Sequence, residues 1–401
     1  MYGDVILNEF DKILAQNRAA SYRGFDHIMW FVGNAKQAAA YFVTRFGFRR
    51  VAYQGLETGS RGIASHVVSN GRCTFVLVAP MRGPDIADDT ISDTEKSGLA
   101  KIHQHLAKHG DGVKDIAFEV EDAKAVYEQA VSRGAKSVME PIFKSDEHGE
   151  VIVAIIEAYG DTTHSFVERS RYKGAFLPGF RRVQEDDLNA NSLPPVPLEE
   201  IDHCVGNHDW GNLETACRYY EASLGFHRFW SPDDGIMLSD YSSMNSVVMA
   251  SGNEVIKMPL NEPAPGLKKS QIEEFIEYYG SAGVQHVAFR TNNVVQCVDS
   301  LIQRGTEFIR VPNTYYEEMS LKLKAAGMGL QEDIAALERL NILVDFDEQG
   351  YLLQTFTKPL GDRPTVFLEI IQRRNFDGFG AGNFRALFEA IEREQKERGN
   401  L

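Results

Sequence analysis

Cysteine is scarce in this sequence, and its spacing excludes two common kinds of structural support. Only four cysteines occur in 401 residues, they are far apart, and no Cys-x-x-Cys pair is present. This pattern argues against a disulfide framework and against structural zinc, and it is typical of a reducing compartment. A secretory signal is also missing, because no basic segment followed by an apolar run opens the chain. We therefore expect a cytoplasmic protein, with residues 1–21 forming a leader ahead of the folded part.

Positive charge is also in short supply. The chain carries 42 Lys and Arg against 57 Asp and Glu, so its formal net charge is −15. Nucleic acids and anionic membranes are bound by clustered basic residues, so we expect neither as a partner. No apolar stretch approaches the ~20 residues that span a bilayer. The glycine-rich nucleotide motifs G-x-G-x-x-G and G-x-x-x-x-G-K-[ST] are missing too, which leaves nucleotide binding without support.

The chain does contain an internal repeat. Three segments of the first half match three segments of the second, and each long copy predicts a strand, an amphipathic helix and a further strand. The matching pairs are FDHIMWFVGNAKQAAAYFVTRFGFRRVAY (25–53) with IDHCVGNHDWGNLETACRYYEASLGFHRFW (201–230), GVKDIAFEVEDAKAVYEQAVSRGAKSVMEP (112–141) with GVQHVAFRTNNVVQCVDSLIQRGTEFIRVP (283–312), and HSFVER (164–169) with VFLEIIQR (366–373). Sheets built from such units curve, so we expect an α+β fold in which each half has a mixed sheet and is able to enclose a cavity.

The repeat also predicts the domain organisation. A chain of 401 residues is long for one hydrophobic core, and the stretch NANSLPPVPLEE, rich in Pro, Asn and Ser, separates the two halves. The expected parts are a leader (1–21), a first domain (22–185), a linker (186–198), a second domain (199–382) and a C-terminal helix (383–401).

Polar residues interrupt the predicted strands of the second half at one position in each repeat pairing. These are His203, His286 and Glu369, and Glu369 stands in the nearly continuous apolar run TVFLEII. A buried carboxylate must be paired, protonated or bound to a metal. Two imidazoles and a carboxylate form the set that suits non-haem Fe(II), although Mn(II), Co(II) or Zn(II) also accept these donors. A core histidine with an ordinary partner is the alternative for each imidazole.

The first half carries a broken version of the same pattern. We assign His27, Asp115 and Glu168 to the corresponding positions, so that an aspartate replaces the second histidine. Aspartate is a shorter and harder ligand, which changes both geometry and metal preference. A hydrogen-bonded or ion-paired carboxylate is the expected role of Asp115, and we expect no catalytic metal in this half.

Several segments carry a family resemblance. The stretches FVGNAKQAA, YQGLETGSR, KHGDGVKDIAFEVED, YGDTTH, KMPLNEPAPGLKKSQI, GVQHVAF, VPNTYY, GYLLQTFTKP, RPTVFLEIIQR and GFGAGNF closely resemble the 4-hydroxyphenylpyruvate dioxygenases, from about residue 24 to the C-terminus. The resemblance implies the vicinal-oxygen-chelate, or glyoxalase-like, fold: two open mixed β-barrel domains, each built from two βαβββ modules, and a C-terminal lid helix. It also implies one Fe(II) per chain, bound by His203, His286 and Glu369.

The activity implied by the resemblance is conversion of 4-hydroxyphenylpyruvate and O₂ to homogentisate and CO₂, in tyrosine and phenylalanine catabolism. The steps are oxidative decarboxylation, ring hydroxylation and side-chain migration, and the implied assembly is a homodimer. The alternative is benzylic hydroxylation of the same substrate, as in 4-hydroxymandelate synthase. Other enzymes of this fold, such as metal isomerases and extradiol dioxygenases, and non-enzymatic binders are further rivals. The intact KMPLNEPAPG and GFGAGNF segments weigh against these.

The resemblance also implies which residues surround the substrate. Polar and aromatic residues share this role: Ser246, Asn261, Gln271, Gln285, Phe356, Phe367, Asn383 and Phe384, with Gln271, Gln285 and Phe384 assigned to catalysis. Amide and hydroxyl groups orient a phenol and an α-keto acid without adding net charge. On an ideal strand Phe367 shares a face with Glu369, whereas Gln285 faces away from His286. Phe384 follows a glycine-rich hinge, and we expect it to steer oxidation toward the ring.

Overall fold

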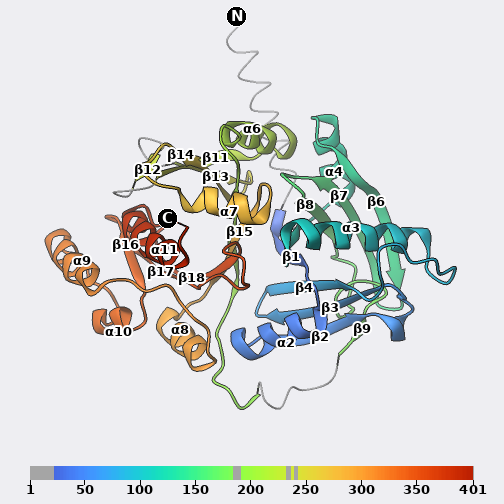
Figure 1. Cartoon of the computed structure of the whole chain (residues 1–401), viewed down its shortest axis with the longest axis horizontal. Coiled ribbons are helices and arrows are strands. Elements are labelled where there is room, and N and C mark those ends of the chain that lie inside the picture. The colour runs from blue at the N-terminus through green and yellow to red at the C-terminus, as the bar shows by residue number, and fades with distance from the viewer. Residues whose placement is uncertain (1–21, 184–190, 232–235, 239–242, 401) are drawn as a thin grey trace, which may run out of the picture.

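The computed structural model describes most of the chain, in the ranges 22–183, 191–231, 236–238 and 243–400. The expected leader (1–21) and part of the expected linker lie outside the described residues. Two curved sheets lie side by side, one from each half of the sequence, with helices packed around them (Figure 1). The described helices include none that is long and apolar enough to cross a membrane.

The first sheet has the strand order β6-β7-β8-β5-β1-β4-β3-β2-β9. Its strands are β1 (Tyr22–Phe31), β2 (Arg49–Gln54), β3 (Ile63–Asn70), β4 (Cys73–Pro80), β5 (Gly112–Val120), β6 (Ser137–Asp146), β7 (Gly149–Glu157), β8 (Thr163–Glu168) and β9 (Arg181–Arg182). The helical elements of this half are α2 (Ala35–Phe46), the short 3₁₀ turn η1 (Leu56–Thr58), α3 (Asp93–His109) and α4 (Ala123–Ser132).

The second sheet has the order β11-β13-β14-β10-β15-β18-β17-β16, and β12 pairs with β13. Its strands are β10 (Glu200–Asn207), β11 (His227–Trp230), β12 (Ile236–Leu238), β13 (Ser243–Ala250), β14 (Lys257–Ala264), β15 (Gly283–Arg290), β16 (Leu343–Phe346), β17 (Tyr351–Phe356) and β18 (Phe367–Arg374). The helical elements are α6 (Leu213–Leu224), α7 (Gln271–Tyr279), α8 (Val294–Gln303), α9 (Asn313–Ala326), α10 (Ile334–Arg339), η2 (Ala381–Asn383) and α11 (Phe384–Arg398).

Each sheet consists of two strand–helix–strands modules joined along their first strands. In the first half, β1 pairs antiparallel with β5, and in the second half β10 pairs antiparallel with β15. Within each module the first strand is parallel to the last: β1 to β4, β5 to β8, β10 to β14 and β15 to β18. The prediction of two open mixed barrels from paired modules is confirmed, as is a helix at the C-terminus.

Local sequence explains why the module helices begin where they do. Asn34, Asp122 and Asn293 each accept a hydrogen bond from a backbone N–H of the first turn of α2, α4 and α8. Such caps stabilise a helix start by about 1 kcal/mol each. Gly47 and Gly225 end α2 and α6 in the left-handed conformation that glycine adopts without strain.

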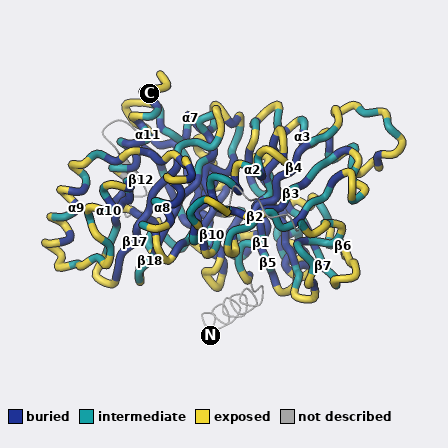
Figure 2. The backbone as a smooth tube through the Cα atoms, turned by 90° about the horizontal axis from the view of Figure 1, so that it is seen from below, coloured by how far each residue is buried: buried dark blue, intermediate teal, exposed yellow. Residues whose placement is uncertain are grey.

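The two halves share one continuous apolar core. Phe48 and Phe75 of the first half pack against Phe289 of the second, with ring centroids 5.8 and 5.5 Å apart. The central strands are buried along most of their length, while exposed residues lie mainly on loops and helix surfaces (Figure 2). The second-half sheet is thereby packed directly against the first half.

Candidate metal centre

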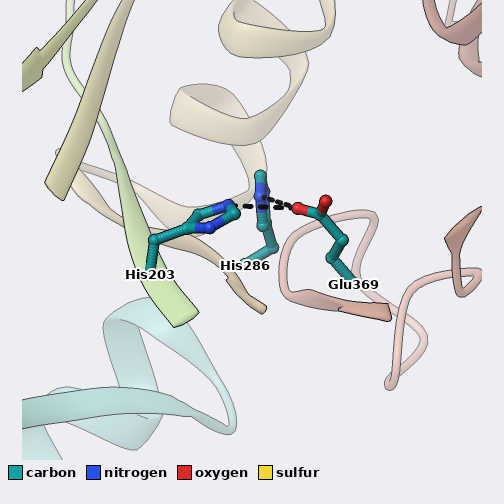
Figure 3. A group of neighbouring side chains, drawn as sticks. All are labelled: His203, His286 and Glu369. Carbon is teal, nitrogen blue, oxygen red and sulfur yellow. Dashed lines mark hydrogen bonds and ion pairs between the residues drawn. The ribbon is translucent and has the colours of Figure 1, made fainter. Parts of the chain in front are cut away.

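Three adjacent strands of the second sheet bring His203, His286 and Glu369 together. Ala288 of β15 lies opposite His203 of β10 and beside Glu369 of β18, and His286 lies two residues before Ala288 on the same strand. Residues two apart on a strand share a face, so all three side chains project to the same side. The three side chains point toward one another (Figure 3).

The geometry of this cluster suits a divalent metal. Glu369 Oε2 lies 3.1 Å from Nε2 of His203 and 3.1 Å from Nε2 of His286, and one ligand atom from each residue lies within 4.8 Å of the others. All three side chains are buried. The second carboxylate oxygen, Oε1, is buried with no hydrogen-bond partner among the described residues. A carboxylate oxygen without a hydrogen-bond partner and two imidazole nitrogens together form a set of donor atoms that is suited to binding a metal ion.

The charges of these groups favour the binding of a cation. Burial acts to raise the pKa of Glu369, but the two imidazoles outweigh this effect and hold the pKa at about 2. The carboxylate is therefore ionised at neutral pH. Burial acts to lower the pKa of His203, but the carboxylates of Glu369 and Asp202 outweigh burial, and the pKa is raised. For His286 burial prevails, and the pKa is lowered.

Asp202 and Arg373 hold His203 from the side away from the cluster. Asp202 occupies a β-bulge, because Ile201 pairs with Phe289 and His203 with Ala288, which leaves Asp202 as the extra residue on β10. Its Oδ1 lies 2.7 Å from His203 Nδ1. Burial alone would raise the pKa of Asp202, but Arg373 and His203 keep it well below its ordinary value.

A second bulge overturns the expectation that Gln285 faces away from His286. Val205 pairs with His286 and Gly206 with Val284, so Gln285 is the extra residue on β15. The bulge breaks the strict alternation of side chains. Gln285 Oε1 consequently lies 2.9 Å from Nδ1 of His286, and its amide nitrogen contacts Gln271 Oε1 at 3.4 Å.

The cluster opens into a cavity that is lined by most of the predicted site residues. Its walls combine aromatic and aliphatic side chains with a few polar groups, which is typical of small-molecule sites. The predicted residues that line it are His203, Ser246, Asn261, Gln271, Gln285, His286, Phe356, Phe367 and Glu369. The cavity thus brings together residues from β10, β13, β14, α7, β15, β17 and β18.

Phe367 shares the face of Glu369, as the strand period predicts. Its ring stacks on His286, with centroids 4.9 Å apart and an angle of 21° between the planes. Phe356 meets the same imidazole edge-on at 5.9 Å. The two rings thereby form an apolar wall on one side of the cluster.

The structure does not bring Asn383 to this cavity. Asn383 is fully buried, and its amide oxygen accepts a hydrogen bond from the Tyr315 hydroxyl at 2.7 Å. This contact ties the start of α11 to α9, while the amide nitrogen of Asn383 is buried with no hydrogen-bond partner among the described residues. A substrate contact of Asn383 stays a prediction. Phe384 is the first residue of α11, and its side chain lies outside the described part of the structure.

Several residues of the site escaped the sequence reasoning. Trp230, Met244, Gln354, Phe379 and Leu387 also line the cavity, and each stands in a segment whose apolar pattern is consistent with ordinary core packing. Asp202 and Arg373 did carry a signal. An Asp-His pair occurs at the matched position of each half, as Asp26-His27 and as Asp202-His203. An arginine likewise ends each of the matched final segments, Arg169 in the first half and Arg373 in the second.

The first-half counterpart of Glu369 is Ser165 and not Glu168. Ala117 pairs with His27 and with Ser165, just as Ala288 pairs with His203 and Glu369. Glu168 lies three residues further along β8. It accepts a hydrogen bond from the N–H of Ala123, the first residue of α4. The expected assignment was wrong because sequence similarity alone did not determine the register of this short strand.

Gln372 confirms this register. It lies three residues beyond Glu369, and it accepts from the N–H of Val294, the first residue of α8, at 2.8 Å. Glu168 and Gln372 are thus equivalent residues that cap equivalent helices. The first half therefore has a serine hydroxyl where the second has a carboxylate ligand.

Asp115 is hydrogen-bonded, as expected from the sequence. Its Oδ1 accepts from the Thr163 hydroxyl at 2.6 Å, and burial raises the pKa of its carboxyl group. His27 lies 2.5 Å from Asp26 and packs against the ring of Phe176.

Comparison with known proteins agrees with this architecture. Residues 26–153 and residues 201–322 each match a family model described as the glyoxalase/bleomycin resistance protein/dioxygenase superfamily. These segments correspond to the two halves of the internal repeat. Among solved structures, a mutant of 4-hydroxymandelate synthase from Streptomyces coelicolor superposes with a TM-score of 0.77 at 28% identity, over 93% of this chain and 99% of the other.

Curated relatives cover nearly the whole chain at much higher identity. The 4-hydroxyphenylpyruvate dioxygenase of Coccidioides posadasii is 57% identical over 95% of this chain and 95% of its own length. That of Xenopus tropicalis is 48% identical over 95% of this chain and 93% of its own length. With this similarity, and with the paired modules and His-His-Glu cluster described above, the chain belongs to the 4-hydroxyphenylpyruvate dioxygenase family.

Proposed function

We propose that this protein converts 4-hydroxyphenylpyruvate and O₂ to homogentisate and CO₂ with one Fe(II) per chain. The observation that carries the proposal is the buried cluster of two imidazoles and an ionised carboxylate at the end of a cavity with amide and aromatic walls. Relatives named 4-hydroxyphenylpyruvate dioxygenase, 48% and 57% identical over almost the full chain, support the choice of reaction.

His203, His286 and Glu369 would hold the metal. Fe(II) held by these residues would supply the activation of O₂ and of an α-keto acid. The protein supplies the remaining requirements. The stacking of Phe367 on His286 restricts the orientation of that imidazole.

The amides that line the cavity are suited to orienting the substrate. Gln271 and Gln285 contact each other through their side chains, and Asn261 Nδ2 contacts Asn207 Oδ1 at 3.4 Å. Ser246 pairs with Asn261 across β13 and β14. These donors and acceptors are neutral, so they position a phenol or an α-keto acid without adding to the charge of the metal site. Phe384, at the start of α11, is proposed to direct oxidation toward the aromatic ring.

The wider biological assignments belong to the same proposal. We place the protein in tyrosine and phenylalanine catabolism, in the cytoplasm, and as a homodimer. The support is family membership together with the four free cysteines, all of which are buried.

Benzylic hydroxylation is the second candidate function, because a 4-hydroxymandelate synthase shares this fold. Its support is weaker, since identity to that structure is 28% against 57% for the dioxygenase of Coccidioides posadasii. The products distinguish the two candidates directly.

Oxygen consumption and product analysis test the proposal. Purified protein supplied anaerobically with Fe(II), then mixed with 4-hydroxyphenylpyruvate and O₂, should consume one O₂ for each homogentisate and CO₂ formed. The matched control is Glu369→Gln, which keeps the side-chain size and removes the charged ligand. Hydroxymandelate as the main product would favour the second candidate, and no substrate-dependent oxygen uptake would refute both.

A further inference from the structure

We propose that Arg373 is a positioning residue that sets the metal affinity of the site by holding His203 on two sides. The inference rests on the proposed metal-binding function, and it concerns a residue outside the lining of the cavity, whose hydrogen bonds go to Asp202, Phe376 and Gly378. Arg373 is the seventh residue of β18, four positions beyond Glu369. Its guanidinium group is almost completely buried, with a side-chain exposure of 6%.

The first contact of Arg373 is a two-point ion pair with Asp202. Arg373 Nε donates to Asp202 Oδ2 at 2.9 Å, and Nη2 donates to Oδ1 at 2.8 Å. A bidentate pair of this kind fixes the plane of the carboxylate as well as its position. Asp202 is therefore held at a single orientation relative to the neighbouring imidazole.

Asp202 in turn selects the form of His203 that binds a metal. An ionised carboxylate only accepts hydrogen bonds, so the imidazole must carry a proton on Nδ1 to donate across the 2.7 Å contact. In the neutral ring the lone pair is then on Nε2, the atom that faces Glu369 at 3.1 Å. A fixed tautomer and ring plane raise the affinity of a histidine for a metal.

The second contact of Arg373 positions the opposite wall of His203. Nη1 donates to the carbonyl oxygens of Phe376 and Gly378. Phe376 and Gly378 lie three positions and one position before Phe379, whose ring meets that of His203 edge-to-face with centroids 5.2 Å apart. The guanidinium carbon also lies 5.0 Å from the centre of the Phe379 ring. One buried cation thus restrains the imidazole both through Asp202 and through this loop.

The first half contains the same arrangement without a complete ligand set. Arg169 Nη2 donates to Asp26 Oδ1 at 2.7 Å, and Asp26 lies 2.5 Å from His27 Nδ1. Arg169 also donates to the carbonyl of Phe176, whose ring meets His27 at 5.0 Å. Asp115 and Ser165 stand at the positions of His286 and Glu369. The first half therefore has the Arg-Asp-His contacts but lacks two of the three metal-binding side chains. It provides a matched internal control for Arg373.

Metal titration of paired variants tests the inference. Metal-free wild type, Arg373→Gln and Arg169→Gln are titrated anaerobically with Co(II) in competition with a chelator, and visible absorption reports the coordination. We expect Arg373→Gln to weaken Co(II) binding about 10- to 100-fold and to alter the spectrum. Arg169→Gln loses the equivalent ion pair, so we expect it to lower the melting temperature while its Co(II) affinity and spectrum match those of wild type.

Each outcome has a defined meaning. If Arg373→Gln does not fold, Arg373→Lys replaces it, because lysine keeps the charge but cannot make the bidentate contact; we expect weakened binding there too. Co(II) affinity within twofold of wild type in the folded variant would overturn the inference. An equal loss of affinity in Arg169→Gln would also overturn it, since the effect would then be general destabilisation. A wild-type protein that binds no Co(II) would instead refute the proposed metal site.

Discussion

His164 is expected to make the stability of this protein depend on pH through a contact between its two halves. The residue is fully buried on β8 of the first half, and its Nε2 lies 2.7 Å from the hydroxyl of Tyr220 on α6 of the second half. Its Nδ1 lies 3.2 Å from the carbonyl oxygen of Ile116. The neutral ring satisfies both contacts, donating from Nδ1 and accepting at Nε2. Burial lowers the pKa of His164 from 6.5 to about 4.

The direction and size of the effect follow from that difference in pKa. Below pH 6.5 the unfolded chain binds a proton at this residue and the folded protein does not, so stability is lost as the pH falls. With one pKa unit equal to about 1.4 kcal/mol, the loss due to His164 is about 1.4 kcal/mol at pH 5.5 and about 2.5 kcal/mol at pH 4.5. Above pH 7 the contribution is fully present.

The assay compares wild type with His164→Gln, in which the amide offers one donor and one acceptor and does not titrate. Urea unfolding of the metal-free proteins is followed from pH 7.5 to pH 4.5. Whatever the difference in unfolding free energy at pH 7.5, we expect it to shift by about 2.5 kcal/mol in favour of the variant at pH 4.5. Other buried histidines titrate equally in both proteins and cancel. A difference that does not change with pH would refute the reasoning.

Three further predictions concern the proposed site. Glu369→Ala should abolish stoichiometric Fe(II) binding and reduce turnover more than about 100-fold while the fold is retained; wild-type metal content in this variant would contradict the ligand assignment. Phe384→Ile should divert part of the product from homogentisate to hydroxymandelate or to uncoupled decarboxylation, and unchanged product ratios by chromatography would rule out steering. Asp115→Asn should leave metal content at one per chain; two tightly bound equivalents in wild type, one of them lost in this variant, would make the first half a functional site.

Several features of the protein were determined by the sequence alone. The repeated strand–helix–strands pattern predicted the four modules, because side-chain periodicity and helix caps such as Asn34 and Asn293 are local properties. The metal cluster was also predictable. His203, His286 and Glu369 each occupy one matched position of the second-half repeats, and a buried carboxylate in an apolar strand has to be paired, protonated or bound to a metal.

The tertiary structure decided how the surrounding residues meet that cluster. The bulge at Gln285 turns its amide toward His286, and the register of β8 places Ser165 where sequence matching had placed Glu168. Arg373 reaches Asp202 across 171 positions of the chain. Bulges, register and ion pairs of this kind arise from pairing between strands that are distant in sequence. A shift of one residue moves a side chain to the opposite face, and the extra residue of a bulge breaks the alternation on which a sequence pattern depends.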